Sequence, residues 1–412
     1  MLFNKDAQYY KFCAYGFFKN LRFFDAFLLL YFIEKGLSYS QIGILYAFRE
    51  IVINVFEILS GIIADALGRK KALVTSFVLY LLSFFMFYAF DRFWGFIIAF
   101  LFFGLADAFR TGTHKAMILA YLKKHNWLAA KTVYYGRTRS WSQKGSALSA
   151  LIGAFLVFYT GDYSLIFLFS TVPYLIDLVL LSTYPNYLNG EVNTKGVSWL
   201  LHVKSYLLQL FSLFKQAAAI KPIVLSSHFT GFYKATRDYL QLIITQVALA
   251  LPLFVDGSPK QNVAFYIGLV YFLLYLINAL VTRKAYLVES WFSSSGGALK
   301  GLQVLAWIAG VVSGFCYVYD YYLLAMLLFG FIVVVQNIRR PITVKYVSDR
   351  FEDKLMASVL SVESQSETIF AAAIALLLGC LVEMYGLGWG IGILSVLLLC
   401  ISAIVDSVRK NS

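Results

Sequence analysis

Charged residues are scarce in this sequence: Asp, Glu, Lys and Arg together make up 14% of its 412 residues. A soluble domain carries about 25% charged residues, whereas this chain is 60% hydrophobic and 18% aromatic. One core cannot bury that much apolar surface, and the remainder would face water. The low charge therefore excludes a soluble globular protein and indicates an all-α integral membrane protein, whose helices satisfy their own backbone in lipid.

Cysteine and the usual signatures of catalysis are also missing or rare. The four cysteines, Cys13, Cys316, Cys380 and Cys400, lie in apolar segments without paired spacing, so we expect small core residues rather than disulfides or a metal site. The sequence contains no H-E-x-x-H, no G-x-S-x-G and no G-x-x-x-x-G-K-S/T motif. We therefore expect neither an enzyme nor a nucleotide-driven pump, and no cofactor.

Basic residues are comparatively abundant and give a formal net charge of +13. In a soluble protein this would suggest a nucleic-acid partner, but here Lys and Arg gather in short segments between apolar stretches. With the N-terminus inside, the inner segments hold twenty-four Lys and Arg and the outer loops hold three, Lys35, Arg92 and Lys260. Because cytoplasmic loops are the basic ones, we expect both termini in the cytoplasm and no nucleic-acid partner.

Long apolar stretches set the number of expected spans, since a helix needs about 20 such residues to cross the hydrocarbon of a bilayer. They occur near residues 12–33, 39–60, 71–90, 93–113, 142–160, 163–184, 222–250, 262–282, 300–318, 321–338, 357–382 and 386–406. The first lacks a signal-peptide cleavage pattern, so we expect it to remain as a span. The sequence thus predicts twelve transmembrane helices in two pseudo-symmetric six-helix bundles, residues 1–184 and 222–412.

A polar stretch, residues 185–221, separates the two predicted bundles and is expected to be a cytoplasmic linker. Within it, Trp199 to Phe214 is rich in Trp, Leu and Phe, which favours an interfacial helix on the cytoplasmic leaflet. A short extra span is the alternative. We disfavour it because His202, Lys204 and Gln209 interrupt the apolar run.

The loop after the second expected span carries a motif of two glycines, an acid and two bases. Its residues are Gly61, Asp65, Gly68, Arg69 and Lys70. Glycine permits close helix packing and a tight turn. An acid such as Asp65 is stabilised at the positive end of a neighbouring helix, and the basic pair contacts anionic headgroups. These properties describe a tight, basic loop that packs closely at the inner face.

This loop resembles the signature G-x-x-x-D-R/K-x-G-R-R/K of the major facilitator superfamily, and departs from it at Ala66, where the family carries a base. The resemblance implies a monomeric transporter that works by alternating access. It also implies that the loop is a conformational latch, which braces the N-terminal half against the eleventh helix. Helices 1, 4, 7 and 10 are implied to line the solute cavity. The glycine-rich antiporter signature of the fifth span is not met by Gly145, Gly153 and Gly161.

Ionisable side chains occur within the expected spans, where a lipid-facing charge is costly and a cavity or a partner is the usual explanation. Several share a helical face by their spacing: Arg22 with Asp25, Glu50 with Asn54 and Glu57, Asp107 with Arg110 and His114, Lys234 with Asp238, and Glu363 with Glu367. Asp177 lies in the sixth span. Gln336, Asn337, Arg339, Arg340 and Pro341 are interpreted as a polar, structural end of the tenth span.

Two interpretations of these charges stay open: pairs such as Arg22 with Asp25 neutralise each other, or some side chains line a solute path. For the second, the excess of cations near mid-span favours binding of a carboxylate or phosphate by guanidinium groups. The expected cavity residues are Arg22, Asp25, Arg110, Lys144, Lys234 and Arg237. The expected proton-coupling residues are Asp25, Glu50, Glu57, Asp107 and Asp238, with Asp25 and Glu50 preferred. Glu363 and Glu367 are expected at a gate.

The function that these patterns favour is secondary active transport of a small ionised organic solute, coupled to H⁺ or Na⁺, in a bacterial inner membrane. Proton-driven efflux of drugs and other lipophilic compounds, and a lipid flippase of the same fold, are the alternatives. Apart from the solute, the ion and the lipid bilayer, we expect no partner.

Overall fold

The computed structural model describes residues 3–189, 217–254, 257–350 and 353–408. The predicted interfacial helix at Trp199 to Phe214 lies outside the described residues. Every regular element in the described part of the chain is a helix. The chain divides into two compact units: Met1–Phe27 with Phe48–Leu208, and Leu28–Ala47 with Gln209–Ser412.

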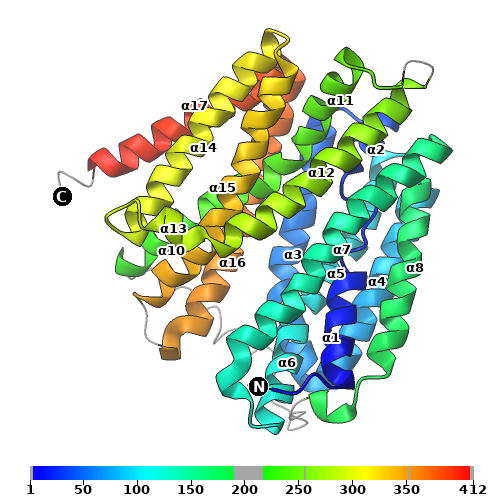
Figure 1. Ribbon diagram of the computed structural model, residues 1–412, viewed down its shortest axis with the longest axis vertical. Coiled ribbons are helices and arrows are strands. Elements are labelled where there is room, and N and C mark those ends of the chain that lie inside the picture. Colours follow the sequence, from blue (N-terminus) through cyan, green and yellow to red (C-terminus); the bar gives the residue numbers. More distant parts are fainter. Residues whose placement is uncertain (1–2, 190–216, 255–256, 351–352, 409–412) are drawn as a thin grey trace. The chain divides into compact units, whose positions relative to one another are not determined.

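The first unit is built from long helices that pack side by side (Figure 1). Its elements are α1 (Ala7–Phe18), most of α3 (Tyr39–Leu67), α4 (Arg69–Ala89), α5 (Phe93–Arg110), α6 (Thr113–Lys124), η1 (Leu128–Ala130), α7 (Lys131–Thr160), α8 (Leu165–Ser182) and η2 (Asn186–Asn189). Helix α4 packs against α5 and α8, and α1 packs against α7 and α8. The core of this unit is therefore formed by α1, α4 and α8.

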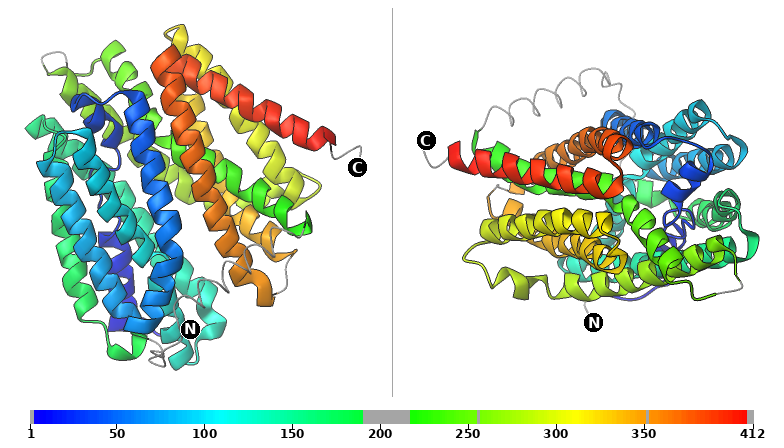
Figure 2. Two further views of the ribbon diagram at one scale, coloured as in Figure 1. Left: turned by 180° about the vertical axis from the view of Figure 1, so that it is seen from behind. Right: turned by 90° about the horizontal axis from the view of Figure 1, so that it is seen from above.

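The second unit contains the remaining helices, which Figure 2 shows from two further sides. Its elements are α2 (Leu28–Glu34), the start of α3, α10 (Ala217–Thr236), η3 (Arg237–Tyr239), α11 (Leu240–Ala250), α12 (Pro259–Arg283), α13 (Ala285–Glu289), α14 (Ser295–Val318), α15 (Tyr322–Ser348), α16 (Asp353–Tyr385) and α17 (Leu387–Val408). Helix α10 packs against α16, and α14 packs against α15 and α17.

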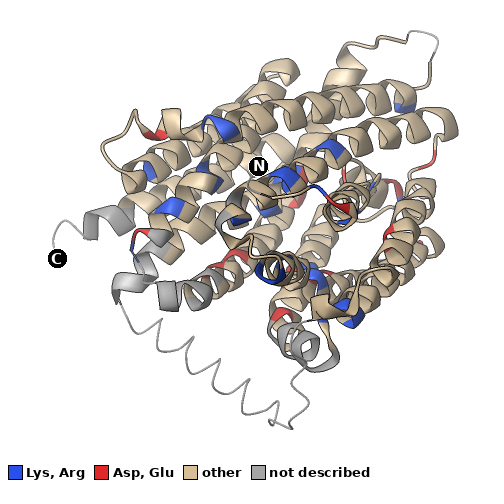
Figure 3. Cartoon of the chain, turned by 60° about the horizontal axis from the view of Figure 1, so that its bottom comes forward, with Lys and Arg blue, Asp and Glu red and all other residues tan. Residues whose placement is uncertain are grey.

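Seven helical stretches in the described part of the chain are long and apolar enough to cross a membrane. They are Arg69–Ala89, Phe93–Lys124, Leu165–Ser182, Pro259–Arg283, Ser295–Val318, Tyr322–Val347 and Ser361–Tyr385. A shorter apolar helix covers Leu387–Ala403. Figure 3 shows that Lys, Arg, Asp and Glu are sparse along the helices.

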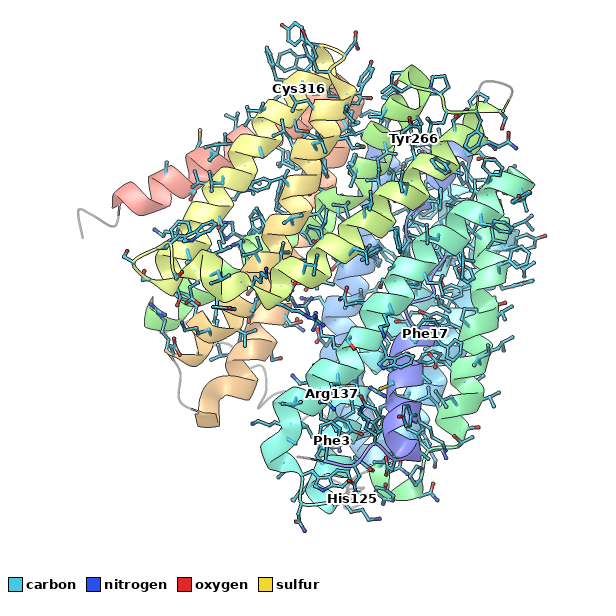
Figure 4. The ribbon with its side chains drawn as sticks, in the orientation of Figure 1. Phe3, Phe17, His125, Arg137, Tyr266 and Cys316 are labelled. Atoms are coloured by element: carbon cyan, nitrogen blue, oxygen red, sulfur yellow. The ribbon has the colours of Figure 1, made fainter. Side chains whose placement is uncertain are left out.

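An aromatic cluster closes the end of the first unit where the chain begins. Figure 4 places Phe3, His125 and Arg137 together at this end. The Phe3 ring lies 4.8 Å from that of Tyr134 and 6.5 Å from that of Trp127, and the Arg137 guanidinium lies 5.3 Å from the Phe3 ring centre. Edge-to-face rings and a cation over a ring each add to the free energy of burial, so this cluster fixes the N-terminal segment on the unit.

The first expected span is not one helix, which corrects the prediction of a continuous helix over 12–33. Helix α1 ends at Phe18, and α2 begins at Leu28 after a series of turns. The Asn20 side-chain amide donates to the Gly16 carbonyl at 2.6 Å, which competes with the helical bonds of that turn. The Phe23 N–H, freed by the break, donates to Ser170 Oγ of α8 at 3.0 Å. A side chain from another helix thus stabilises the break.

Glycines of α7 let this broken segment approach closely. A Cβ on Gly145 would lie 2.4 Å from the Phe17 carbonyl oxygen, and one on Gly153 would lie 2.5 Å from that of Phe23. Both distances are far shorter than a van der Waals contact. The glycines that fail to match an antiporter signature therefore have a packing role at this crossing.

Gly145→Ala is expected to lower the free energy of unfolding by about 1–3 kcal/mol, because the added methyl group must push α7 away from α1. Gly136→Ala is the matched control: Gly136 lies on the same helix, and nothing is within 4 Å of the Cβ position. The control should be neutral or slightly stabilising, since Ala favours a helix. Thermal unfolding of both purified variants measures the difference, and equal behaviour would contradict the close crossing.

Candidate functional site

A cluster of charges lies inside the first unit, between α4, α5, α8 and the broken first span. Its carboxylate is Asp107, which pairs with Arg110 Nη2 at 2.7 Å and lies 3.6 Å from Arg22 Nη2. The three side chains are between 15% and 23% exposed. Two guanidinium groups therefore share one carboxylate in a largely buried place, and this triad of Arg22, Asp107 and Arg110 carries one net positive charge.

Two tyrosines hold the triad in place. The Tyr80 hydroxyl donates to Asp107 and accepts a hydrogen bond from Arg110 Nε at 3.0 Å. The Tyr174 hydroxyl accepts from Arg22 Nε at 2.5 Å and donates to the Lys19 carbonyl at 2.9 Å. These bonds anchor each guanidinium through its Nε, so the groups keep fixed positions without any bound solute.

Aromatic rings surround the Arg22 guanidinium. Its central carbon lies 5.0 Å from the ring centres of Tyr80 and Phe103, and 5.9 Å from that of Tyr174. Ring faces attract a cation without neutralising it. The Arg22 charge can therefore still be matched by an added anion, which a guanidinium can bind with two parallel hydrogen bonds.

Some of the residue pairings and shared helical faces predicted from the sequence are confirmed, and others are wrong. The expected pairing of Asp107 with Arg110 is present. The expectation that Arg22 and Asp25 share a helical face is wrong, because the chain forms turns there and no helix. Arg22 also reaches Asp107, which the spacing did not predict. The three residues Asp107, Arg110 and His114 also do not continue one helix, since α5 ends at Arg110 and α6 starts at Thr113.

In the second unit the expected pairing of Lys234 with Asp238 is also wrong. Lys234 Nζ lies 3.2 Å from Glu367 Oε2, and Arg237 Nε lies 3.2 Å from Asp238 Oδ1. The reason is local: α10 ends at Thr236 and a 3-10 turn follows, so the four-residue spacing does not keep one face. Lys234 and the predicted gate residue Glu367 are thus brought together.

The remaining residues predicted for proton coupling, a gate or the cavity differ in burial and in their contacts. Glu50 is buried and pairs with Arg49 at 3.0 Å. Glu57 lies half-buried on α3. Glu363 is 8% exposed on α16, one turn before Glu367. Lys144, predicted for the cavity, is exposed on α7 with its Nζ 5.0 Å from the Trp141 ring centre.

Asp177 of α8 is a buried acid that the sequence analysis noted but gave no role. It is fully buried, and no side chain of the described residues donates a hydrogen bond to its carboxylate. Lys19 is the cation whose charge acts on it. Its signal in the sequence was an acid in the middle of an apolar span. Its complete burial is visible only in the structure.

The predicted latch loop has a partner that the sequence did not reveal. Gly68 has φ 96°, a conformation that favours glycine, and is the N-cap residue directly before α4. The Lys70 N–H donates to Asn189 Oδ1 at 2.9 Å, and the Lys70 ammonium donates to the Tyr184 carbonyl at 2.8 Å. Arg69 donates to the Ala116 carbonyl at 3.4 Å. The side chains of Gly61 and Asp65 are outside the described part, so the latch role stays a prediction.

Known proteins resemble this chain over nearly all of its length. A family model described as Major Facilitator Superfamily matches residues 12–364. The uncharacterized MFS-type transporter YxaM of Bacillus subtilis (strain 168) is 22% identical over 401 residues, which cover 94% of this chain and 93% of the relative.

Solved structures share the fold at low identity. The nucleoside transporter NupG has 14% identity and a TM-score of 0.74, with coverage of 98% of this chain and 99% of that chain. A D-xylose-proton symporter has 16% identity and a TM-score of 0.67, with 95% of each chain covered. Together with the apolar helices, the family match shows that the chain is a multi-pass membrane protein of the Major Facilitator Superfamily, a transport protein and not an enzyme.

Proposed function

We propose that this protein is a secondary active transporter of a small ionised organic solute, and that the solute carries a carboxylate or phosphate. The triad carries this proposal: Arg22 and Arg110 both pair with Asp107, so these three side chains carry one net positive charge in a place that is 15–23% exposed. An anion of matching charge would neutralise it. A neutral or cationic solute would leave it uncompensated, which is unfavourable in a low-dielectric site.

The proposal includes the full membrane layout. Twelve transmembrane helices form bundles over 1–184 and 222–412, joined by a cytoplasmic linker at 185–221, with both termini in the cytoplasm of a bacterial cell and the chain working as a monomer. Alternating access of the two bundles moves the solute. The basic inner loops support this orientation, since outer loops hold only Lys35, Arg92 and Lys260.

Proton coupling is the third part of the proposal. A D-xylose-proton symporter is among the structures with this fold, and the chain has several acids placed in helices. Asp25 and Glu50 are the preferred proton carriers, with Glu57, Asp107 and Asp238 as the other candidates. Asp177 is added because no side chain of the described residues neutralises it through a hydrogen bond.

Reconstitution into liposomes tests the proposal directly. Radiolabelled organic anions, amino acids, nucleosides and a fluorescent lipid are offered with and without an imposed pH gradient. We expect uphill uptake of an organic anion that collapses with the gradient, and at least a tenfold loss in Arg22→Gln and Arg110→Gln. Arg92→Gln, an exposed outer-loop residue, is the matched control and should transport normally.

The same experiment contains the results that would overturn the proposal. Movement of cationic amphiphiles alone would indicate drug efflux, and movement of the fluorescent lipid alone would indicate a flippase. Unchanged dependence on the pH gradient in Asp25→Asn, Glu50→Gln and Asp177→Asn together would exclude these acids as proton carriers.

A further inference from the structure

A second buried cation lies in the other unit, at Arg339 of α15. The sequence placed this residue at a polar helix end, but its side chain is 1% exposed and α15 continues past it to Ser348. It packs between α10, α14 and α15, which contact one another (Figures 1 and 2). Gln303, its partner on α14, lies about 12 Å from the start of that helix at 1.5 Å per residue.

The contacts of Arg339 hold it without neutralising it. Its Nη2 donates to the Leu225 carbonyl at 3.0 Å and to Gln303 Oε1 at 3.3 Å. The guanidinium carbon lies 4.1 Å from the ring centre of Phe229. All three partners are neutral. Among the residues that the structure describes, no carboxylate forms an ion pair with Arg339.

Two hydrogen-bond donors in this region have no acceptor in the described part of the chain. They are Nε of Arg339 and Nε1 of Trp307, whose side chain is also 1% exposed. Trp307 follows Gln303 by one helical turn on α14, and its ring lies 6.3 Å from that of Phe229. Buried donors in native proteins almost always have an acceptor. A full charge and two unused donors in one buried place indicate a missing negative partner.

We propose that the Arg339 site binds a small monovalent anion, either chloride or the carboxylate of a small organic acid. The anion accepts hydrogen bonds from the guanidinium and the Trp307 indole and compensates the buried charge. Arg340, the adjacent and exposed arginine, adds positive potential on the approach to the site. This inference does not rest on the transport proposal, because the site lies within the second unit and shares no residue with the triad.

Anion titration of the purified protein tests the site. The apparent melting temperature is measured against sodium chloride and against sodium acetate, with sodium isethionate, a bulky sulfonate without a carboxylate, keeping the ionic strength constant. We expect a saturable rise of about 3 °C or more, since an anion that binds only the folded state stabilises it. Saturation with chloride alone identifies a halide site, and saturation with acetate as well identifies a carboxylate site.

Variants decide whether the effect belongs to Arg339. The saturable rise should vanish in Arg339→Gln and persist in Arg340→Gln, the matched control one residue away. If Arg339→Gln does not fold, Trp307→Phe serves instead, and its midpoint should move to at least about tenfold higher anion concentration through loss of one donor. No saturable rise in the wild type, or an unchanged midpoint in these variants, would overturn the proposal. Arg22→Gln should abolish transport but keep this titration, so the two proposals fail separately.

Discussion

Asp107→Asn is expected to lower the free energy of unfolding by about 3 kcal/mol and to abolish transport. The change keeps the shape of the side chain but removes the carboxylate that, among the described residues, pairs with both Arg22 and Arg110. Removing one member of a buried ion pair leaves the other charges uncompensated. The free energy lost in this way is much larger than the net stabilisation that the intact pair provides. Thermal unfolding and liposome uptake measure the two effects.

A charge-restoring double variant separates electrostatics from shape. Asp107→Asn combined with Arg110→Gln returns the net charge of the triad from two positive charges to the single positive charge of the wild type, although Arg22 loses its carboxylate. We therefore expect recovery of part of the lost stability but not of transport. Asp320→Asn is the control: Asp320 is exposed at a turn with φ 64°, where Asn is equally well tolerated. An Asp107→Asn protein as stable as Asp320→Asn would show that the triad is not coupled as described.

Gln241→Leu is expected to destabilise the second unit by about 3 kcal/mol. Gln241 is fully buried on α11, and its Oε1 accepts from the N–H groups of Leu29 and Leu30 at 3.0 and 3.4 Å. These belong to the first turn of α2, where N–H groups have no partner within the helix. Without water in the membrane interior, each unsatisfied N–H costs about 1–3 kcal/mol.

Thermal unfolding measures this effect against two comparison variants. Gln246→Leu removes an amide from the same helix that bonds to the Tyr317 side chain rather than to a helix start, so its effect should be smaller. Gln241→Glu keeps an acceptor at the start of α2 and should retain more stability than Gln241→Leu. Equal losses in Gln241→Leu and Gln246→Leu would mean that the α2 bonds contribute little.

Residue patterns within one segment predicted the fold well. The stretch 93–113 contains α5, and 300–318 ends where α14 ends, because an apolar run of membrane length leaves few structures other than a helix. The break in the first span could not be predicted this way. It depends on Ser170 and Gln241, which lie far along the chain and accept the N–H groups that the break exposes.

For the candidate site too, contacts within one helix could be predicted and contacts between distant segments could not. Asp107 and Arg110 could be paired from their spacing on one helix. The addition of Arg22 and the two tyrosines depends on how three further segments pack, and nothing in their local sequence specifies it. Lys234 and Glu367 could not be paired from the sequence for the same reason, since their pairing joins α10 and α16, which are far apart along the chain.

The net charge of the triad also bears on how membrane voltage would act on the carrier. A potential of 100 mV is worth about 2.3 kcal/mol for one elementary charge that crosses the whole field. With a monovalent anion alone bound, Arg22, Asp107 and Arg110 sum to zero with their solute. A coupled proton bound with the anion restores one positive charge, which equals the charge of the empty triad. Exchange of the anion without a proton would therefore carry net charge and produce a current, whereas a one-to-one cycle of anion and proton would be electroneutral and produce none.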